Sequence, residues 1–166
     1  MGVCIFLLDV DLIVRWRDRI RCASRVPMLR QVSSALPIRA SRAGLHEFTN
    51  DVTEFVRESG IETGLLTLFC RHTSASLVIQ ENAAPAARRD LERYFERIAP
   101  EGADYEHEDE GPDDMPAHLR SALTATQLSI PVEGGKPVLG TWQGIFLFEH
   151  RRGTPERQIA LHLVGE

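Results

Sequence analysis

The segment 144–151 constrains the fold most, because its side chains alternate between two faces as in an extended strand. The two faces carry the sets Ile145, Leu147 and Glu149, and Phe146, Phe148 and His150. Glu149 thus shares a face with apolar side chains, and a carboxylate buried there is costly unless it is paired. We therefore expect a partner for Glu149, either Arg157 or a histidine of an active site.

The remaining elements follow from the spacing of the apolar residues. Strands are expected over 31–37, on either side of 71–76, and over 127–132 and 158–164. Helices are expected over 48–60, after Pro85 and from Asp113 or Asp114 onward. The links 134–135 and 153–155 are typical of hairpins. Hairpin-linked strands with inserted helices predict an α+β fold of largely antiparallel sheets with about two to three helices.

Composition excludes several classes of function. The 166 residues carry a formal net charge of −5, and no basic stripe is interleaved with aromatics, so nucleic acid is not an expected partner. Cys4, Cys22 and Cys70 form no CxxC pair, which indicates free thiols in a reducing compartment. No apolar run approaches the length of a membrane span. We therefore expect a cytoplasmic protein without a membrane partner.

The first residues differ in charge from the rest of the chain. Residues 1–30 carry six arginines and three aspartates, and their pattern does not continue into the alternating segments that follow. We interpret residues 1–29 as a basic extension and residues 30–166 as one domain. The extension is expected to be a poorly packed tail or, if translation begins at Met28, not to be translated.

Histidines in polar surroundings are candidates for a metal site. His72, His107 and His118 all lie in turn-rich or acidic stretches. Three imidazoles and a water suit an open zinc-type site, where the metal lowers the pKa of the bound water. The alternative is that His72 is a hydrogen-bonded strand residue and that the other two are surface histidines.

Polar groups near these histidines suggest an anion site. Asp113 and Asp114 can cap a helix, orient a histidine four or five residues on, or hold magnesium with a diphosphate. The hydroxyls of Thr73, Ser74 and Ser76, with Arg71, are placed to bind an anion. A serine nucleophile is not expected because the GxSxG elbow is absent, and Cys70 is expected to be a buried, inert thiol. Glycines on both sides of Trp142 and Gln143 predict a sharp turn or a close approach by a ligand or another chain.

Together these segments resemble the YjbQ family, described as secondary thiamine-phosphate synthases. The resemblance rests on HTSAS at 72–76, QEN at 80–82, DDMPAH at 113–118, and LGTWQGI at 139–145 with EHR at 149–151. It covers residues 30–166. Ala84-Pro85 departs from the family pattern, which usually has Asp-Pro at this place.

The resemblance implies a small α+β homotrimer that joins hydroxymethylpyrimidine diphosphate to thiazole phosphate at a low level. It implies catalytic roles for His72, Asp114, His118 and Glu149, with His107 as a third metal ligand beside His72 and His118. The implied contacts to substrate or anion are Arg71, Thr73, Ser74, Ser76, Asn82, Trp142, Gln143 and Arg151.

Three hypotheses remain open from the sequence. The first is a transferase of the thiamine type, with magnesium and diphosphate. The second is a metal-dependent hydrolase of a phosphorylated small metabolite, with a zinc-type ion at the histidines. The third is a non-catalytic trimer that binds a metal or an anion.

Overall fold

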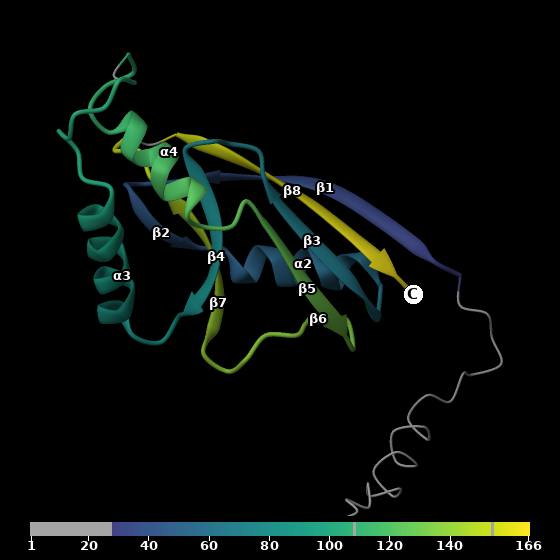
Figure 1. Cartoon of the computed structure of the whole chain (residues 1–166). Coiled ribbons are helices and arrows are strands. Elements are labelled where there is room, and N and C mark those ends of the chain that lie inside the picture. Colours follow the sequence, from purple (N-terminus) through teal and green to yellow (C-terminus); the bar gives the residue numbers. More distant parts are fainter. Residues whose placement is uncertain (1–27, 108, 154) are drawn as a thin grey trace, which may run out of the picture.

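The computed structural model describes residues 28–166 except 108 and 154 (Figure 1). Residues 1–27 of the basic extension predicted over 1–29 therefore lie outside the described residues. The elements in chain order are β1 (Arg30–Arg39), β2 (Gly44–Glu47), α2 (Thr49–Ser59), β3 (Thr63–Cys70), β4 (Ala75–Glu81), α3 (Pro85–Ile98), α4 (Asp114–Ala122), β5 (Gln127–Glu133), β6 (Lys136–Pro137), β7 (Gln143–Glu149) and β8 (Glu156–Gly165).

These strands form two antiparallel sheets. One sheet has five strands in the order β1-β8-β3-β5-β6, and the other has three in the order β2-β7-β4. The predicted α+β class with antiparallel sheets is confirmed. The short strands β2 and β6 were not predicted from the sequence.

Only one of the two predicted hairpins forms. Gly134 and Gly135, both at positive φ, form a hairpin turn as expected, but this turn joins β5 to the two-residue strand β6 and not to β7. The second prediction is wrong, because β7 belongs to the three-stranded sheet whereas β8 belongs to the five-stranded one. The glycine and proline of this link signal a change of direction but do not determine whether the flanking strands pair. The chain instead crosses from one sheet to the other.

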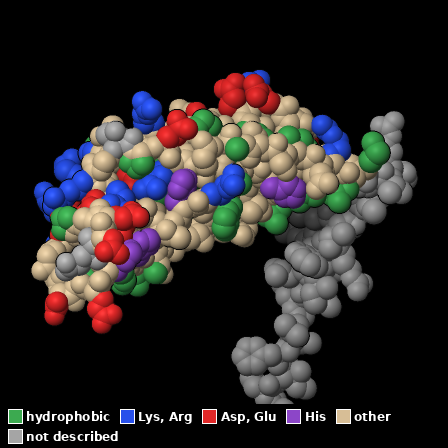
Figure 2. Space-filling model, turned by 90° about the horizontal axis from the view of Figure 1, so that it is seen from above, with side chains coloured by type: hydrophobic (Ala, Val, Ile, Leu, Met, Phe, Trp, Pro, Cys, Tyr) green, Lys and Arg blue, Asp and Glu red, His purple; other side chains and the backbone are tan. Residues whose placement is uncertain are grey.

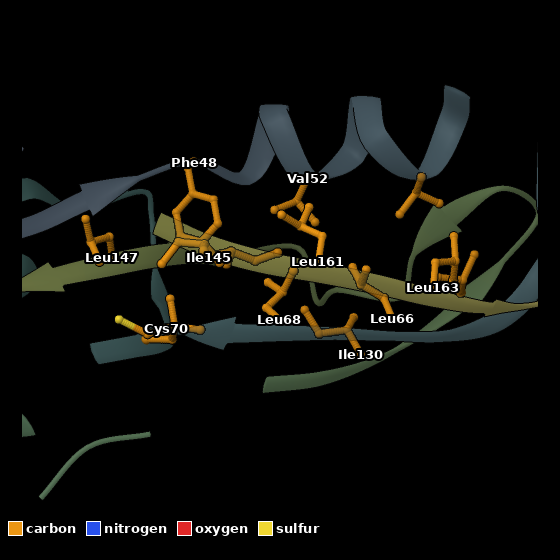
Figure 3. Packing of buried hydrophobic residues seen from close by; sticks show 14 of the residues in the cluster. Phe48, Val52, Leu66, Leu68, Cys70, Ile130, Ile145, Leu147, Leu161 and Leu163 are labelled. Atoms are coloured by element: carbon orange, nitrogen blue, oxygen red, sulfur yellow. The ribbon is translucent and has the colours of Figure 1, made fainter. Parts of the chain in front are cut away.

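The main hydrophobic core joins both sheets to α2. Phe48, just before α2, and Val52 face Ile145 and Leu161, with no more than 3% of any of these residues exposed (Figure 3). The amphipathic pattern of α2 thus buries its apolar face against strands of both sheets.

A second, smaller core lies on the other face of β7. Phe146 and Phe148 pack there with Leu45, and α3 covers them with Leu91 and Phe95. The rings of Phe95 and Phe148 meet edge to face at 5.2 Å. Because β7 is covered on both faces, its two alternating sets of side chains are both buried.

Two chain crossings meet at one end of the molecule. The link between β3 and β4 passes from the five-stranded to the three-stranded sheet, and the link from β7 to β8 passes back. Helix α4 is fixed to the same end, where the hydroxyl of Ser121 donates to the carbonyl of Ala75 at 3.0 Å. The polar segments around His72, Asp114 and Glu149 are thereby brought together. Among the described residues, no helix is both long and apolar enough to span a membrane.

Candidate functional site

Titratable side chains gather at the end where the two crossings meet. Figure 2 shows acidic, basic and histidine side chains close together at one end of the molecule. Helix α4 contributes Asp114 and His118, and the acidic loop before it contributes His107. The links contribute their own polar groups, from Arg71 to Ser74 and from His150 to Arg152.

His107, Asp114 and His118 form a compact group of potential metal ligands. One nitrogen or oxygen atom from each lies within 4.8 Å of the others. Nε2 of His107 is 2.8 Å from Oδ2 of Asp114, and Nε2 of His118 is 3.6 Å from Oδ1. Neighbouring ligands on a tetrahedral zinc ion are separated by about 3 Å. The spacing of these atoms is therefore compatible with one shared cation.

The protein holds His118 in the orientation that a ligand needs. Its Nδ1 lies 3.1 Å from the carbonyl oxygen of Thr73, which can only accept a hydrogen bond. Nδ1 of the neutral ring therefore carries the proton, and Nε2 presents its lone pair toward Asp114. A hydrogen bond from the second ring nitrogen to a carbonyl is the usual support of a metal-binding histidine.

The Asp114 carboxylate provides a direct test of fit for a cation. Asp114 is buried, and Nη1 of Arg151 donates to its Oδ1. Oδ2 is buried and accepts no hydrogen bond from the described residues, although Nε2 of His107 approaches it. A buried carboxylate oxygen without a partner is costly unless a cation or donor meets it. The residues present thus fit a metal ion at Oδ2.

The composition of this group differs from the predicted set of three histidines. His72 lies outside it, because its Nε2 accepts the backbone N–H of Gln158 at 2.8 Å. Burial, and next the charge of Arg157, lower the pKa of His72, so the ring is neutral. His72 thus ties the link between β3 and β4 to strand β8, and Asp114 is the third potential ligand beside the two histidines.

Asp113 does not cap α4, which was one of the three roles weighed for it. It precedes α4, but its side chain makes no capping hydrogen bond, so the predicted cap is wrong. Its Oδ2 instead accepts from the backbone N–H of Arg152 at 2.8 Å and from Nε of Arg151 at 3.2 Å. Burial alone would raise the pKa of Asp113, but these two contacts and the Arg151 charge lower it. Asp113 therefore anchors the link after β7 to α4.

Glu149 is paired with Arg157, one of its two expected partners. Nε and Nη2 of Arg157 each donate to one of its carboxylate oxygens at 2.6 Å, and neither residue is more than 8% exposed. The backbone N–H of Arg151 also donates to Glu149, and Nη2 of Arg157 reaches the hydroxyl of Ser74 at 3.1 Å. Both carboxylate oxygens of Glu149 are thus occupied, and Glu149 holds Arg157 in position.

A cavity rich in arginine adjoins the ligand group. It has a volume of about 670 Å³ and is lined mainly by Ser74, Glu110, Asp113, Arg151, Arg152 and Arg157. Arg151 belongs both to this cavity and to the contacts of Asp114. We call it the arginine cavity. Its three guanidinium groups are each paired with a carboxylate, so an anionic ligand such as a phosphate would bind through the N–H donors that these pairs leave over.

The other predicted contact residues lie elsewhere. Trp142 and Gln143 line a groove at the opposite end of β7, and the carbonyl of Trp142 accepts the backbone N–H of Asn82. Ser76 is fully buried, with its hydroxyl on His150. Arg71 and Thr73 are exposed, and Thr73 contributes its carbonyl rather than its hydroxyl. Of the predicted anion contacts, the structure brings Ser74 and Arg151 into the arginine cavity.

Two arginines of this cavity were not among the predicted contacts. Arg152 follows Arg151 in a non-periodic link, and Arg157 entered the analysis only as a partner for Glu149. Their common signal in the sequence is the density of basic residues at 151–157, between two strands that belong to different sheets.

Comparisons with known proteins agree on one family. The family model described as UPF0047 protein YjbQ-like matches residues 34–166. A UPF0047 protein of Synechocystis is 48% identical over 144 residues, which cover 86% of this chain and 98% of the relative. The YjbQ protein of Salmonella typhimurium is 47% identical over 126 residues, covering 74% and 90%.

Solved structures show the same relationship. A protein of Sulfolobus solfataricus, described as YbjQ-like and of unknown function, superposes with a TM-score of 0.77 at 27% identity, covering 83% of this chain and 99% of the other. A YjbQ/UPF0047 protein of Clostridium acetobutylicum gives a TM-score of 0.70 at 33% identity, covering 80% and 98%. In sequence and in fold, this chain belongs to the YjbQ (UPF0047) family.

Proposed function

We propose that this protein is a metal-dependent enzyme that hydrolyses a phosphate ester or anhydride of a small metabolite. The observation that carries the proposal is the ligand group of His107, Asp114 and His118 directly beside the arginine cavity. A divalent ion in such a group supplies Lewis acidity and activates water for hydrolysis.

The surrounding side chains have separate tasks in this proposal. The Thr73 carbonyl keeps Nε2 of His118 free for the ion. Glu149 holds Arg157 in place, so that this guanidinium and the hydroxyl of Ser74 receive the phosphate oxygens. Arg151 connects the metal-ligand group to the arginine cavity, because it contacts Asp114 and also lines the cavity. Fixed donors of this kind stabilise charge that develops on phosphate oxygens during the reaction.

The ligand chemistry favours a zinc-type ion over magnesium. Two of the three donors are imidazole nitrogens, which suit zinc and neighbouring transition metals. Magnesium prefers oxygen ligands and retains several waters. Hydrolysis is therefore placed ahead of a magnesium-diphosphate reaction.

Thiamine-phosphate synthesis, implied by the family resemblance, is the second candidate. The observation in its favour is the charge of the arginine cavity, since departure of diphosphate from a pyrimidine carbon needs several cationic groups. The expected reaction joins hydroxymethylpyrimidine diphosphate to thiazole phosphate. The names of the relatives state no reaction.

A homotrimer belongs to the same proposal. The five-stranded sheet leaves Leu65 and Phe69 of its central strand β3 nearly half exposed. Apolar side chains on an uncovered sheet face support self-association. Light scattering coupled to size exclusion tests it, with three chains per particle as the expected result.

Metal analysis of matched variants tests the ligand group. We expect about one zinc-type ion per chain in protein purified without chelator. Asp114→Asn and His118→Gln are expected to lose at least tenfold in metal affinity, whereas Asp113→Asn and His72→Gln retain the ion. Asp113→Asn is thus the control for Asp114→Asn, and His72→Gln is the control for His118→Gln. Equal metal content in all four variants would contradict the site.

Activity assays then separate the functions. The metal-loaded protein is expected to release inorganic phosphate from some member of a panel of phosphorylated metabolites, and Arg157→Gln should abolish this release. Product from the two thiamine precursors, without release of phosphate from the panel, would replace hydrolysis by transfer. Stoichiometric binding without turnover in either assay would indicate that the protein binds its ligand without catalysing a reaction.

A further inference from the structure

Arg151 is the arginine of the cavity whose donors are most fully used. Its Nε donates to Oδ2 of Asp113 at 3.2 Å. Its Nη1 donates to Oδ1 of Asp114 and to Oε2 of Glu110, the latter at 3.3 Å. Its Nη2 donates to the backbone carbonyl of Glu110 at 2.7 Å. A phosphate that enters the cavity therefore competes with acidic side chains for this guanidinium group.

The three carboxylates on Arg151 differ in their exposure to solvent. The side chains of Asp113 and Asp114 are 12% and 2% exposed, whereas that of Glu110 is 72% exposed. Removing the arginine from a buried carboxylate leaves that charge without a counterion, which is costly. An exposed carboxylate is instead hydrated when its ion pair opens, so the pair contributes little. Glu110 is therefore the carboxylate that can leave Arg151 at the lowest cost.

The charges around the cavity disfavour a phosphate that simply adds to them. The three guanidinium groups of the cavity contact five carboxylates, those of Glu101, Glu110, Asp113, Asp114 and Glu149. Five negative charges against three positive ones leave two in excess. An incoming phosphate is repelled by this excess unless a cation binds nearby or a carboxylate moves away.

The backbone of Glu110 is held separately from its side chain. Nη2 of Arg151 holds the Glu110 carbonyl, and this contact does not depend on where the carboxylate lies. The side chain can therefore rotate into solvent while its loop stays in place. Because Glu110 and Arg151 both line the arginine cavity, this rotation frees one N–H of Nη1 at the cavity.

We propose that Glu110 is an internal competitor of the substrate: its carboxylate occupies the position on Arg151 that the phosphate group of the ligand takes. The inference rests on the proposed function, since it takes the arginine cavity as the phosphate site. A phosphate carries more charge and more acceptor oxygens than a carboxylate, so it displaces Glu110. A ligand with only one carboxylate gains little by the same exchange. Glu110 thereby selects phosphorylated metabolites over carboxylic acids.

Titration calorimetry with inorganic phosphate tests the competition. The full-length protein is purified without chelator and titrated at constant ionic strength. Glu110→Gln is expected to bind phosphate about three- to tenfold more tightly than wild type, because the competitor is lost. Glu106→Gln makes the same change of charge on an exposed residue of the same loop that does not line the cavity. It is expected to leave the phosphate affinity unchanged, and an equal gain in both variants would overturn the proposal.

Glu110→Asp separates contact from overall charge. This variant keeps the negative charge but shortens the side chain, so the 3.3 Å contact with Nη1 is lost. We expect it to bind phosphate at least twofold more tightly than wild type. Wild-type affinity in Glu110→Asp would show that charge alone acts, and would overturn the proposal.

Two further outcomes distinguish this inference from the proposed function. Phosphate binding with equal affinity in wild type and Glu110→Gln would overturn the competition but leave the arginine cavity as a phosphate site. Absence of phosphate binding in both proteins would overturn the cavity as a phosphate site, and the competition with it. Glu110 is exposed, so neither of its substitutions is expected to impair folding.

Discussion

The two ends of β7 carry motif residues in opposite environments. At its start, Trp142 is 64% exposed beside an open groove of about 620 Å³. At its end, Glu149 is fully buried and its carboxylate is held by Arg157 and by the backbone of Arg151. Polar residues are thus fixed at one end of the strand, and a large aromatic side chain faces solvent at the other.

This difference follows from where the chain crosses between the sheets. At the end of β7, two crossings and α4 approach one another, so buried polar atoms find partners from other segments. At its start, the partners come mainly from adjacent turns, as when the Gly140 backbone N–H donates to Oε1 of Gln143. Precise positioning of side chains for chemistry needs partners from several segments, as at the end of β7. An exposed apolar groove, as at its start, suits contact with another molecule.

The buried ion pair offers the largest test of this comparison. Glu149→Gln removes one charge and leaves Arg157 buried without a counterion. We expect the free energy of unfolding to fall by about 3 to 5 kcal/mol, measured by urea denaturation. The exposed pair of Glu54 and Arg57, at 2.7 Å, provides the control, since Glu54→Gln should change stability by less than about 1 kcal/mol. Equal effects of the two variants would contradict the assigned burial.

The pH dependence of stability gives the next largest effect. In the folded protein the pKa of His150 is lowered to about 3 from 6.5. Between these values the unfolded chain binds more protons at this residue, so stability decreases as the pH falls from 6.5 toward 3. By pH 5 the loss attributable to His150 is about 2 kcal/mol.

Chemical denaturation at pH 7 and pH 5 measures that loss. Other groups titrate in the same interval, so the decisive quantity is the difference between wild type and His150→Asn. The variant is expected to be less stable at pH 7 but to lose about 2 kcal/mol less on acidification. An identical pH dependence in the two proteins would show that protonation of His150 does not destabilise the folded protein.

The sequence predicts best what depends on periodicity. The alternation in β7 placed Glu149 among apolar side chains and made an ion pair with Arg157 an expected outcome. The helical spacing from Asp114 to His118 likewise puts both on one face of α4. These features need only the local geometry of one strand or one helix.

Which residues come together in the site depends on link segments that have no periodic pattern. His72 is turned toward Gln158 by the link between β3 and β4, and His107 is brought over α4 by the acidic loop. The polar residues in these links have no repeat from which a direction can be read. The crossing after β7 was mistaken for a hairpin for the same reason, since its turn residues are common to both arrangements.

Trp142→Ala tests the exposed end of β7 and should give the smallest effect. Because most of the side chain is already in water, truncation of Trp142 is expected to change the free energy of unfolding by less than about 1 kcal/mol. Phe148, on the same strand but 3% exposed, is the matched control, and Phe148→Ala should cost about 3 to 5 kcal/mol in urea denaturation. A loss for Trp142→Ala as large as for Phe148→Ala would mean that Trp142 is covered in solution. Dependence of that loss on protein concentration would then identify a second copy of the chain as the cover.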